Sequence, residues 1–167
     1  MLRLPIAGLP DGLHVRTLRA SAEALDLDPA VFGEAEVEVR LDVAGRRILA
    51  SFEARATATL ECDRTLKPYA QPVAGQHAVL FVPPDLYDPG MADDPDVQLL
   101  PDDATEVDLT EPVRDTLVLA LPMRRVSPEA EAAELRTIYG PDGEADAPGD
   151  PRWEALRALR SDPDSAS

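Results

Sequence analysis

Two adjoining stretches of the chain alternate between apolar and polar residues, the pattern typical of half-buried strands. In residues 35–43 the three valines and Leu41 share one parity, and the charged side chains share the other. The alternation resumes after a short turn at Gly45 and continues over residues 48–62. This pattern predicts two strands joined as an antiparallel hairpin. Because the second strand is longer than most, we expect it to bend or to change partners midway.

A weaker third strand is predicted over residues 67–82, where Pro68, Pro72 and Gly75 indicate a sheet edge or a bulge. Residues 83–105 follow it and contain seven aspartates among prolines and glycines, which predicts a mobile acidic loop. These aspartates lack the alternate spacing and the closing glutamate of a calcium loop, so we expect no metal site there.

Apolar residues at helical spacing begin after the acidic loop. We expect Thr110 to cap a helix whose apolar face includes Leu117 and Leu121, and this is predicted to be the core helix. A further helix is predicted over residues 127–139, because the Ser-Pro-Glu at its start suits a helix N-terminus.

The chain's only tryptophan lies in a short predicted terminal helix. Asp150 can accept hydrogen bonds from free backbone N–H groups, Pro151 suits the first helical position, and Trp153 and Leu156 fall on one side. A helix this short is marginal alone in water. We therefore expect Trp153 to pack against the body of the protein or, as the alternative, against a partner.

At 167 residues the chain has the length for one domain with a core. We predict an α+β fold in which an antiparallel β-sheet, with a strongly curved or barrel-like sheet as one form, packs with the core helix and the C-terminal helix. The predicted boundaries are a domain over residues 1–139 that includes the acidic loop 83–105, a linker over 140–149, a docked helix over 150–160 and a disordered tail over 161–167.

The formal net charge of −16 argues against broad electrostatic binding to nucleic acid or to an anionic membrane, because like charges repel within a Debye length. An acidic surface would instead attract a basic protein; the alternative is that the excess of Asp and Glu serves solubility alone. Apolar runs fall short of the ~20 residues that cross a bilayer. Residues 1–8 do not have a signal peptide's hydrophobic segment, so the cytoplasm is the expected compartment.

A local cluster of arginines is the alternative route to RNA. Basic side chains in this chain are almost all arginines, whose guanidinium groups suit phosphate recognition. Such a patch would draw on Arg46, Arg47, Arg124, Arg125, Arg152 and Arg157. It would neutralise few phosphates, so the affinity for RNA would depend only weakly on salt concentration.

The sequence contains no motif for nucleotide binding, for a serine nucleophile or for a zinc protease. A thiol enzyme is a second alternative, in which His77 would activate Cys62 across a strand turn. The plainer interpretation is that Cys62 is a small buried residue on the apolar face of its strand and that His77 is a half-exposed strand residue. We therefore predict no catalytic residue. One cysteine and two histidines offer no cluster for structural zinc, and no cofactor is expected.

Four segments of the chain, in this order, resemble the YceD family of bacterial and plastid proteins linked to accumulation of large-subunit ribosomal RNA. The segments are residues 6–14, 61–64, 107–122 and 150–156, and the closing Asp-Pro-Arg-Trp is the most specific of them. Many relatives have Cys-x-x-Cys after the long strand, whereas Thr65 replaces the second cysteine here. A metal or redox role based on those cysteines is therefore not carried over.

The resemblance implies a non-enzymatic factor in large ribosomal subunit biogenesis. We expect its acidic surface to bind a basic ribosomal protein or a large-subunit assembly intermediate, with direct RNA contact as the rival hypothesis. The residues expected to contact the partner are Arg64, Arg114, Asp150, Arg152 and Trp153. Those expected to support the structure are Cys62, Asp63, Leu117, Leu121 and Leu156.

Overall fold

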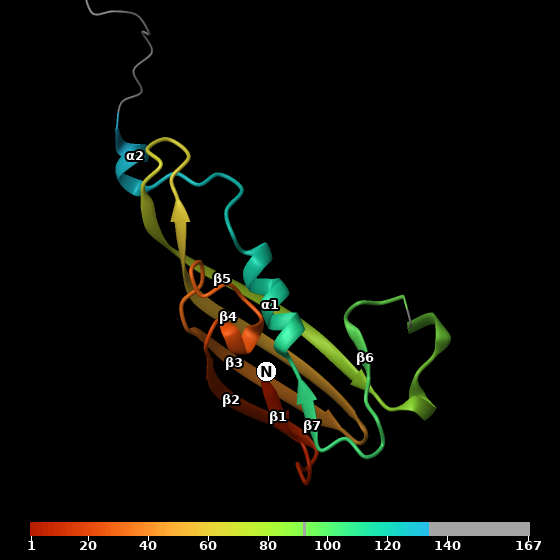
Figure 1. The fold of residues 1–167 in the computed structure, drawn as a ribbon. Helices are drawn as coiled ribbons and strands as arrows, with labels where there is room; N and C mark the ends of the chain where they lie inside the picture. Colours follow the sequence, from red (N-terminus) through yellow and green to blue (C-terminus); the bar gives the residue numbers. More distant parts are fainter. Residues whose placement is uncertain (92, 134–167) are drawn as a thin grey trace, which may run out of the picture. The chain divides into compact units, whose positions relative to one another are not determined.

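The computed structural model describes residues 1–91 and 93–133 (Figure 1). All the helices and strands given below belong to one unit, Met1–Ala132. The predicted linker, terminal helix and tail lie outside the described residues. So does the end of the helix predicted over 127–139.

A five-stranded sheet forms the body of this unit, in the order β2-β3-β4-β5-β6. Its strands are β2 (Gly12–Ala20), β3 (Ala35–Ala44), β4 (Arg47–Glu61), β5 (Pro68–Val82) and β6 (Val97–Leu99). Strands β2 to β5 pair antiparallel in sequence order, and β6 runs parallel to β5. The α+β class is confirmed, but the sheet is mixed rather than antiparallel. It is also open, with β2 and β6 at its two edges, so the barrel-like form is wrong.

The hairpin of β3 and β4 follows the predicted alternation. Gly45, at the turn between the two strands, has a φ of +61° that a side chain would strain. Strand β4 pairs with β5 as far as Glu61 but with β3 only as far as Arg55. Beyond that point Phe32 takes the place of β3 through a bridge to Ala58. The long strand therefore changes partners on one edge, as expected.

The predicted acidic loop contains a strand. Residues 83–96 pass through two short 3-10 turns, η2 (Pro84–Leu86) and η3 (Pro89–Met91), and then Val97–Leu99 pairs with the end of β5. A parallel neighbour needs a connection of roughly a dozen residues or more, and this acidic segment has that length. Strand β5 itself pairs with β4 in continuous register, without the bulge that was one expectation.

One face of the sheet is covered by a second layer. This layer contains a two-stranded sheet of β1 (Arg3–Pro5) and β7 (Glu106–Asp108), the 3-10 turn η1 (Glu23–Leu25) and helix α1 (Thr110–Leu119). Helix α1 packs on β5, β4 and η1. A short helix, α2 (Pro128–Ala132), follows it. The opposite face of the sheet carries the charged side chains of the alternating pattern and is exposed.

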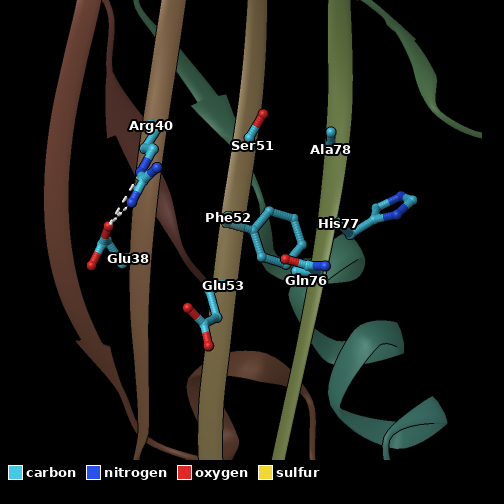
Figure 2. Close-up of a pocket in the computed structure, with 8 residues that line it drawn as sticks. All are labelled: Glu38, Arg40, Ser51, Phe52, Glu53, Gln76, His77 and Ala78. Atoms are coloured by element: carbon cyan, nitrogen blue, oxygen red, sulfur yellow. Dashed lines mark hydrogen bonds and ion pairs between the residues drawn. The ribbon is translucent and has the colours of Figure 1, made fainter.

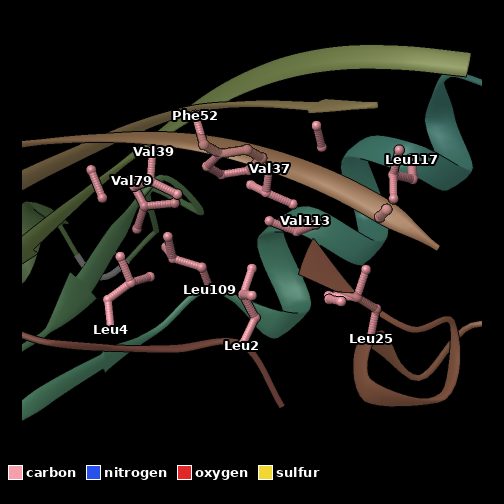
Figure 3. Packing of buried hydrophobic residues seen from close by; sticks show 14 of the residues in the cluster. Leu2, Leu4, Leu25, Val37, Val39, Phe52, Val79, Leu109, Val113 and Leu117 are labelled. Atoms are coloured by element: carbon pink, nitrogen blue, oxygen red, sulfur yellow. The ribbon is translucent and has the colours of Figure 1, made fainter. Parts of the chain in front are cut away.

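The core lies between these two layers (Figure 3). The sheet contributes the apolar parity of β3 and β4, with Val37 and Val39 fully buried. The second layer contributes Val113 and Leu117 from α1, which are also fully buried. The prediction that α1 is the core helix is therefore confirmed, and Leu121 packs on the same cluster as a partly buried side chain.

The start of α1 differs from the prediction that Thr110 caps it. Asp108 supplies the acceptor instead: its Oδ1 receives hydrogen bonds from the Thr110 N–H (2.9 Å) and the Thr110 hydroxyl (2.5 Å). The Thr110 oxygen is buried and accepts a hydrogen bond from the Leu2 N–H at 2.6 Å. Thr110 is used in this way because β1 brings Leu2 next to the helix, a contact that local sequence does not predict.

None of the helices within residues 1–91 and 93–133 combines the length and apolar character that a membrane span requires.

Candidate protein-binding surface

A groove lies on the helix-covered side of β5, between α1 and the segment that enters β6. We call it the acidic groove. It is lined by His77, Val79, Pro95, Asp96, Gln98, Glu111, Pro112, Asp115, Thr116 and Leu119. Three of these residues are carboxylates, and Leu119 is an apolar side chain that is 83% exposed. The groove therefore offers negative charge together with uncovered apolar surface.

The charges of the acidic groove are only partly compensated. His77 Nε2 lies 3.0 Å from Asp96 Oδ1. Arg114 Nε lies 2.9 Å from Asp115 Oδ1, and an Arg114 Nη atom lies 3.5 Å from Glu111 Oε1. The hydrogen bond to Asp115 raises the pKa of Arg114, with a further contribution from the charge of Glu111. His77 and Arg114 together carry at most two positive charges against three carboxylates, so the groove keeps a negative charge.

The segment from residue 83 to residue 105 adds to this negative surface. It contains seven aspartates and no lysine, arginine or histidine. Arg46 pairs with two of the aspartates, Asp85 (2.7 Å) and Asp102. In the described part of the chain, no lysine or arginine pairs with the other five, which are exposed: Asp88, Asp93, Asp94, Asp96 and Asp103. A basic partner could therefore pair with carboxylates that are not already paired with a lysine or arginine of the described chain.

The arginines proposed for RNA contact do not form one patch. Arg46 and Arg47 lie at the start of β4, whereas Arg125 lies beyond its end, where its backbone bonds to Asp63. A strand of 15 residues spans roughly 50 Å at ~3.3 Å per residue. Arg124 pairs with Glu131 at 3.3 Å. The two pairs are thus far apart, and Arg152 and Arg157 lie outside the described residues.

The described residues expected to contact a partner are engaged within the protein. An Arg64 Nη atom donates a hydrogen bond to the Ala130 carbonyl at 2.6 Å, which ties the end of β4 to α2. Arg114 bonds to its neighbours on α1, as described above. The other expected contacts, Asp150, Arg152 and Trp153, lie outside the described residues, as does Leu156.

Cys62 and Asp63 join the end of β4 to the segment after α1. The Asp63 N–H donates to the Arg125 carbonyl (2.7 Å), and the Arg125 N–H donates back to Asp63 Oδ2 (2.9 Å). Cys62 is fully buried, and its Sγ accepts a hydrogen bond from the Ser127 N–H at 3.4 Å. We call this set of contacts the 62–65 junction, in which the side chain of Thr65 also helps to lower the pKa of the Cys62 thiol.

The structure separates Cys62 from His77. His77 is paired with Phe52, ten positions before Cys62 on β4. At ~3.3 Å per residue this corresponds to roughly 30 Å. The histidine ring packs edge-on against Phe52, with ring centroids 6.1 Å apart. The turn after β4 therefore does not bring an activating base to the thiol, and the arrangement required for the thiol enzyme is absent from the described residues.

The 62–65 junction should make stability depend on pH through Cys62. The hydrogen bond from the Ser127 N–H, helped by Thr65 and opposed by burial, lowers the pKa of Cys62 to about 6. When the pKa of a thiol is lower in the folded chain than in the unfolded chain, ionisation of that thiol stabilises the folded state. The contribution of Cys62 is complete above the pKa that the thiol has in the unfolded chain, and it is lost as the pH falls through about 6. We expect the urea midpoint of the natural chain to rise between pH 6 and pH 9 relative to that of Cys62→Ala. Parallel profiles for the two proteins would contradict this prediction.

A second depression lies on the exposed face of the sheet (Figure 2). It forms because two short side chains, Ser51 and Ala78, are paired across β4 and β5 beside longer ones. Its charges are balanced locally, since Arg40 bonds to Glu38 at 2.8 Å and Arg55 bonds to Glu53 at 2.7 Å. This depression therefore lacks the net negative charge of the acidic groove.

No three His, Cys, Asp or Glu side chains come together as metal ligands in the residues that the structure describes. Sequence reasoning missed the acidic groove, because Asp96 reaches β5 only when β6 forms. The apolar Val97, Leu99 and Leu100 inside an otherwise acidic segment were the available signal.

The chain was compared with models of known protein families. The model of the family described as the large ribosomal RNA subunit accumulation protein YceD matches residues 50–160, which is more than half of the chain. The chain belongs to the YceD family. The region that matches the YceD model includes the acidic groove, the 62–65 junction, α1 and α2, and excludes β1 to β3. Searches of curated proteins and of solved structures gave no match.

Proposed function

We propose that this protein supports accumulation of the large ribosomal subunit as a non-catalytic binding factor in the cytoplasm. It holds a basic ribosomal protein or assembly factor on its acidic surface until the precursor RNA is ready. Membership of the YceD family supports the ribosomal part of this proposal. The observation that carries the protein-binding part is the exposed and only partly compensated negative charge of the acidic groove and of residues 83–105.

Electrostatics favours a protein partner over RNA. The net charge of −16 repels phosphate, while it attracts lysine- and arginine-rich surfaces and speeds their association. The four described arginines of the RNA hypothesis are divided between the two ends of β4, and two of them, Arg46 and Arg124, pair with carboxylates. Direct RNA binding is therefore kept as an outcome of the test.

The test is affinity purification of the tagged protein from its own cells at two salt concentrations, with protein and RNA in the eluate identified. We expect basic ribosomal proteins or pre-large-subunit material at low salt, with a marked decrease at high salt because the contact is electrostatic. An eluate with RNA but no basic ribosomal protein would contradict the proposal and favour direct RNA contact. An eluate with neither would contradict both.

A matched pair of variants separates local from overall charge. The test variant is Asp88→Asn/Asp93→Asn/Asp103→Asn, in the acidic segment. The control is Glu34→Gln/Asp42→Asn/Glu61→Gln, which removes the same charge from carboxylates elsewhere on the surface. We expect recovery of the basic protein to fall several-fold in the test variant only. Equal losses would mean that overall acidity, rather than this surface, governs binding.

A further inference from the structure

Strand β5 has one edge that is paired only at its end. The Leu80 N–H donates to the Asp96 carbonyl (2.7 Å), and the Val82 carbonyl accepts from the Leu100 N–H (2.8 Å). The backbone groups of these alternate residues of β5 therefore point away from β4. Strand β6 extends this pairing over Leu80–Val82 and no further.

The same parity continues back along β5. Because backbone direction alternates along a strand, the N–H and C=O groups of Ala78, Gln76 and Ala74 also point away from β4. Among the described residues, no backbone group bonds to them on that side. Ala74 and Gln76 are exposed and Ala78 is partly exposed. We call this stretch the open edge of β5.

Other parts of the sheet boundary are protected, as edges of natural sheets usually are. Further back on β5, Pro72 has no N–H to offer, and its carbonyl accepts a hydrogen bond from the Gln71 side chain at 3.1 Å. At the opposite boundary, Arg16 on β2 bonds to the Val15 carbonyl at 2.9 Å. Within residues 1–91 and 93–133, the open edge between Ala74 and Ala78 has neither a proline nor a side chain bonded to its carbonyls.

The open edge of β5 lies beside the acidic groove. His77, between two residues of the open edge, lines the groove, and Figure 2 shows its ring beyond β5, on the side away from β4. The groove supplies carboxylates from Asp96 on one wall and from Glu111 and Asp115 on the other. Unpaired backbone groups therefore occur beside carboxylates whose charge is only partly compensated.

We propose that the open edge of β5 binds an extended lysine- and arginine-rich segment of the partner, which adds to the sheet as a further strand. This inference rests on the proposed function and names the means by which the acidic surface holds its basic partner. The segment's backbone bonds to Ala74, Gln76 and Ala78. Its side chains alternate between the two faces of the sheet, so every second one reaches the acidic groove.

Charge decides between the available occupants. A second copy of the chain would bring another net charge of −16 to an edge that is already acidic, which opposes pairing. A basic segment gains the same backbone hydrogen bonds and also neutralises the groove. Basic side chains recurring at every second position fit this edge best.

The key variant is Gln76→Pro, which removes one outward N–H. The pairing with β4 does not use this N–H, and Pro72 already occupies a position of the same parity on the same strand. The fold should therefore be retained. The matched control is Gln76→Thr, which keeps the N–H and suits a strand. Asp96→Asn/Glu111→Gln tests the groove, with Asp42→Asn/Glu61→Gln as its charge-matched control.

The probe is a fluorescein-labelled nonapeptide of alternating lysine and threonine, titrated against the full chain by fluorescence anisotropy at low salt. We expect binding to weaken at least tenfold with Gln76→Pro and with Asp96→Asn/Glu111→Gln, and to change little with either control. A peptide with methylated backbone nitrogens, which cannot pair, should bind as weakly as the parent peptide binds Gln76→Pro. Equal affinities for the two peptides would overturn the inference, even if Gln76→Pro failed to fold.

Amide hydrogen exchange locates the contact. The N–H groups of Ala74, Gln76 and Ala78 should exchange rapidly in the free chain and slowly with the peptide bound. Protection of these amides in the free monomer would mean that the edge is already occupied, and a dimer abolished by Gln76→Pro would assign the edge to a second copy. Either result overturns the inference.

The cellular purification separates this inference from the proposed function. If the tagged natural chain recovers no basic protein, the proposed function fails. If the natural chain does recover a basic protein, and Gln76→Pro recovers as much of that protein as Gln76→Thr does, the proposed function stands and strand addition is wrong.

Discussion

Replacing Leu117 by alanine is expected to lower the free energy of unfolding by about 2–5 kcal/mol, the range for a buried leucine that leaves a cavity. Leu117 is fully buried in the core between α1 and the sheet (Figure 3). Removing its branched end takes apolar surface from the contact that holds the two layers together. Urea denaturation followed by far-UV circular dichroism measures the change.

The control for Leu117→Ala is Val118→Ala, the next residue of α1, which is 45% exposed. Alanine has the higher helix propensity, so this variant should be neutral within about 0.5 kcal/mol. Similar losses in the two variants would mean that α1 is not packed on the sheet as described.

Gly75→Ala is expected to destabilise the protein by about 1–3 kcal/mol, the usual range for overpacking. A Cβ at Gly75 would lie 2.6 Å from the Thr116 methyl and 3.3 Å from the Thr116 carbonyl oxygen. The methyl cannot turn aside freely, because the Thr116 hydroxyl donates a hydrogen bond to the Pro112 carbonyl at 2.8 Å. Helix α1 would therefore have to move away from β5. Thermal unfolding monitored by circular dichroism gives the measurement.

The double variant Gly75→Ala/Thr116→Ser tests this cause. Serine keeps the hydroxyl and removes the methyl, so the shortest contact disappears while the hydrogen bond remains. We expect the double variant to recover most of the stability lost in Gly75→Ala, after allowance for Thr116→Ser alone. Additive effects of the two substitutions would contradict a direct clash between these residues.

The central hairpin was predictable because its signal is local. Alternation over residues 35–43 and 48–62 places every second side chain on one face, and a single turn at Gly45 determines the pairing. Helix α1 was predictable for a similar reason, since Val113 and Leu117 recur at helical spacing. In these elements the local pattern and the tertiary burial agree.

The remaining strands depend on partners that are distant in sequence. Residues 12–20 form the edge strand β2, whose apolar Leu13 and Val15 are 65% and 48% exposed. Burial therefore imposes no clear alternation of apolar and polar residues on this segment, and the sequence pattern did not predict a strand there. Strands β1 and β7 have three residues each and exist only because they pair with one another.

The acidic groove could not be predicted as a site for the same reason. Its walls come from α1 and from the segment before β6, and its floor comes from β5. Each of these pieces is unremarkable alone: aspartates in a loop, a glutamate in a helix's first turn, a histidine in a strand. Only the parallel return of β6 onto β5 brings them together.

The pairing of β1 with β7 has a consequence for the order of folding. Leu4 pairs with Val107, and the Leu2 N–H bonds to Thr110, 108 positions later in the chain. The antiparallel strands β2 to β5 can associate as each emerges from the ribosome, because their neighbours are consecutive. The apolar side chains of β1 stay uncovered until β7 has been synthesised. Since closing so long a loop is slow, a nascent chain interrupted before residue 107 should expose this surface to chaperones.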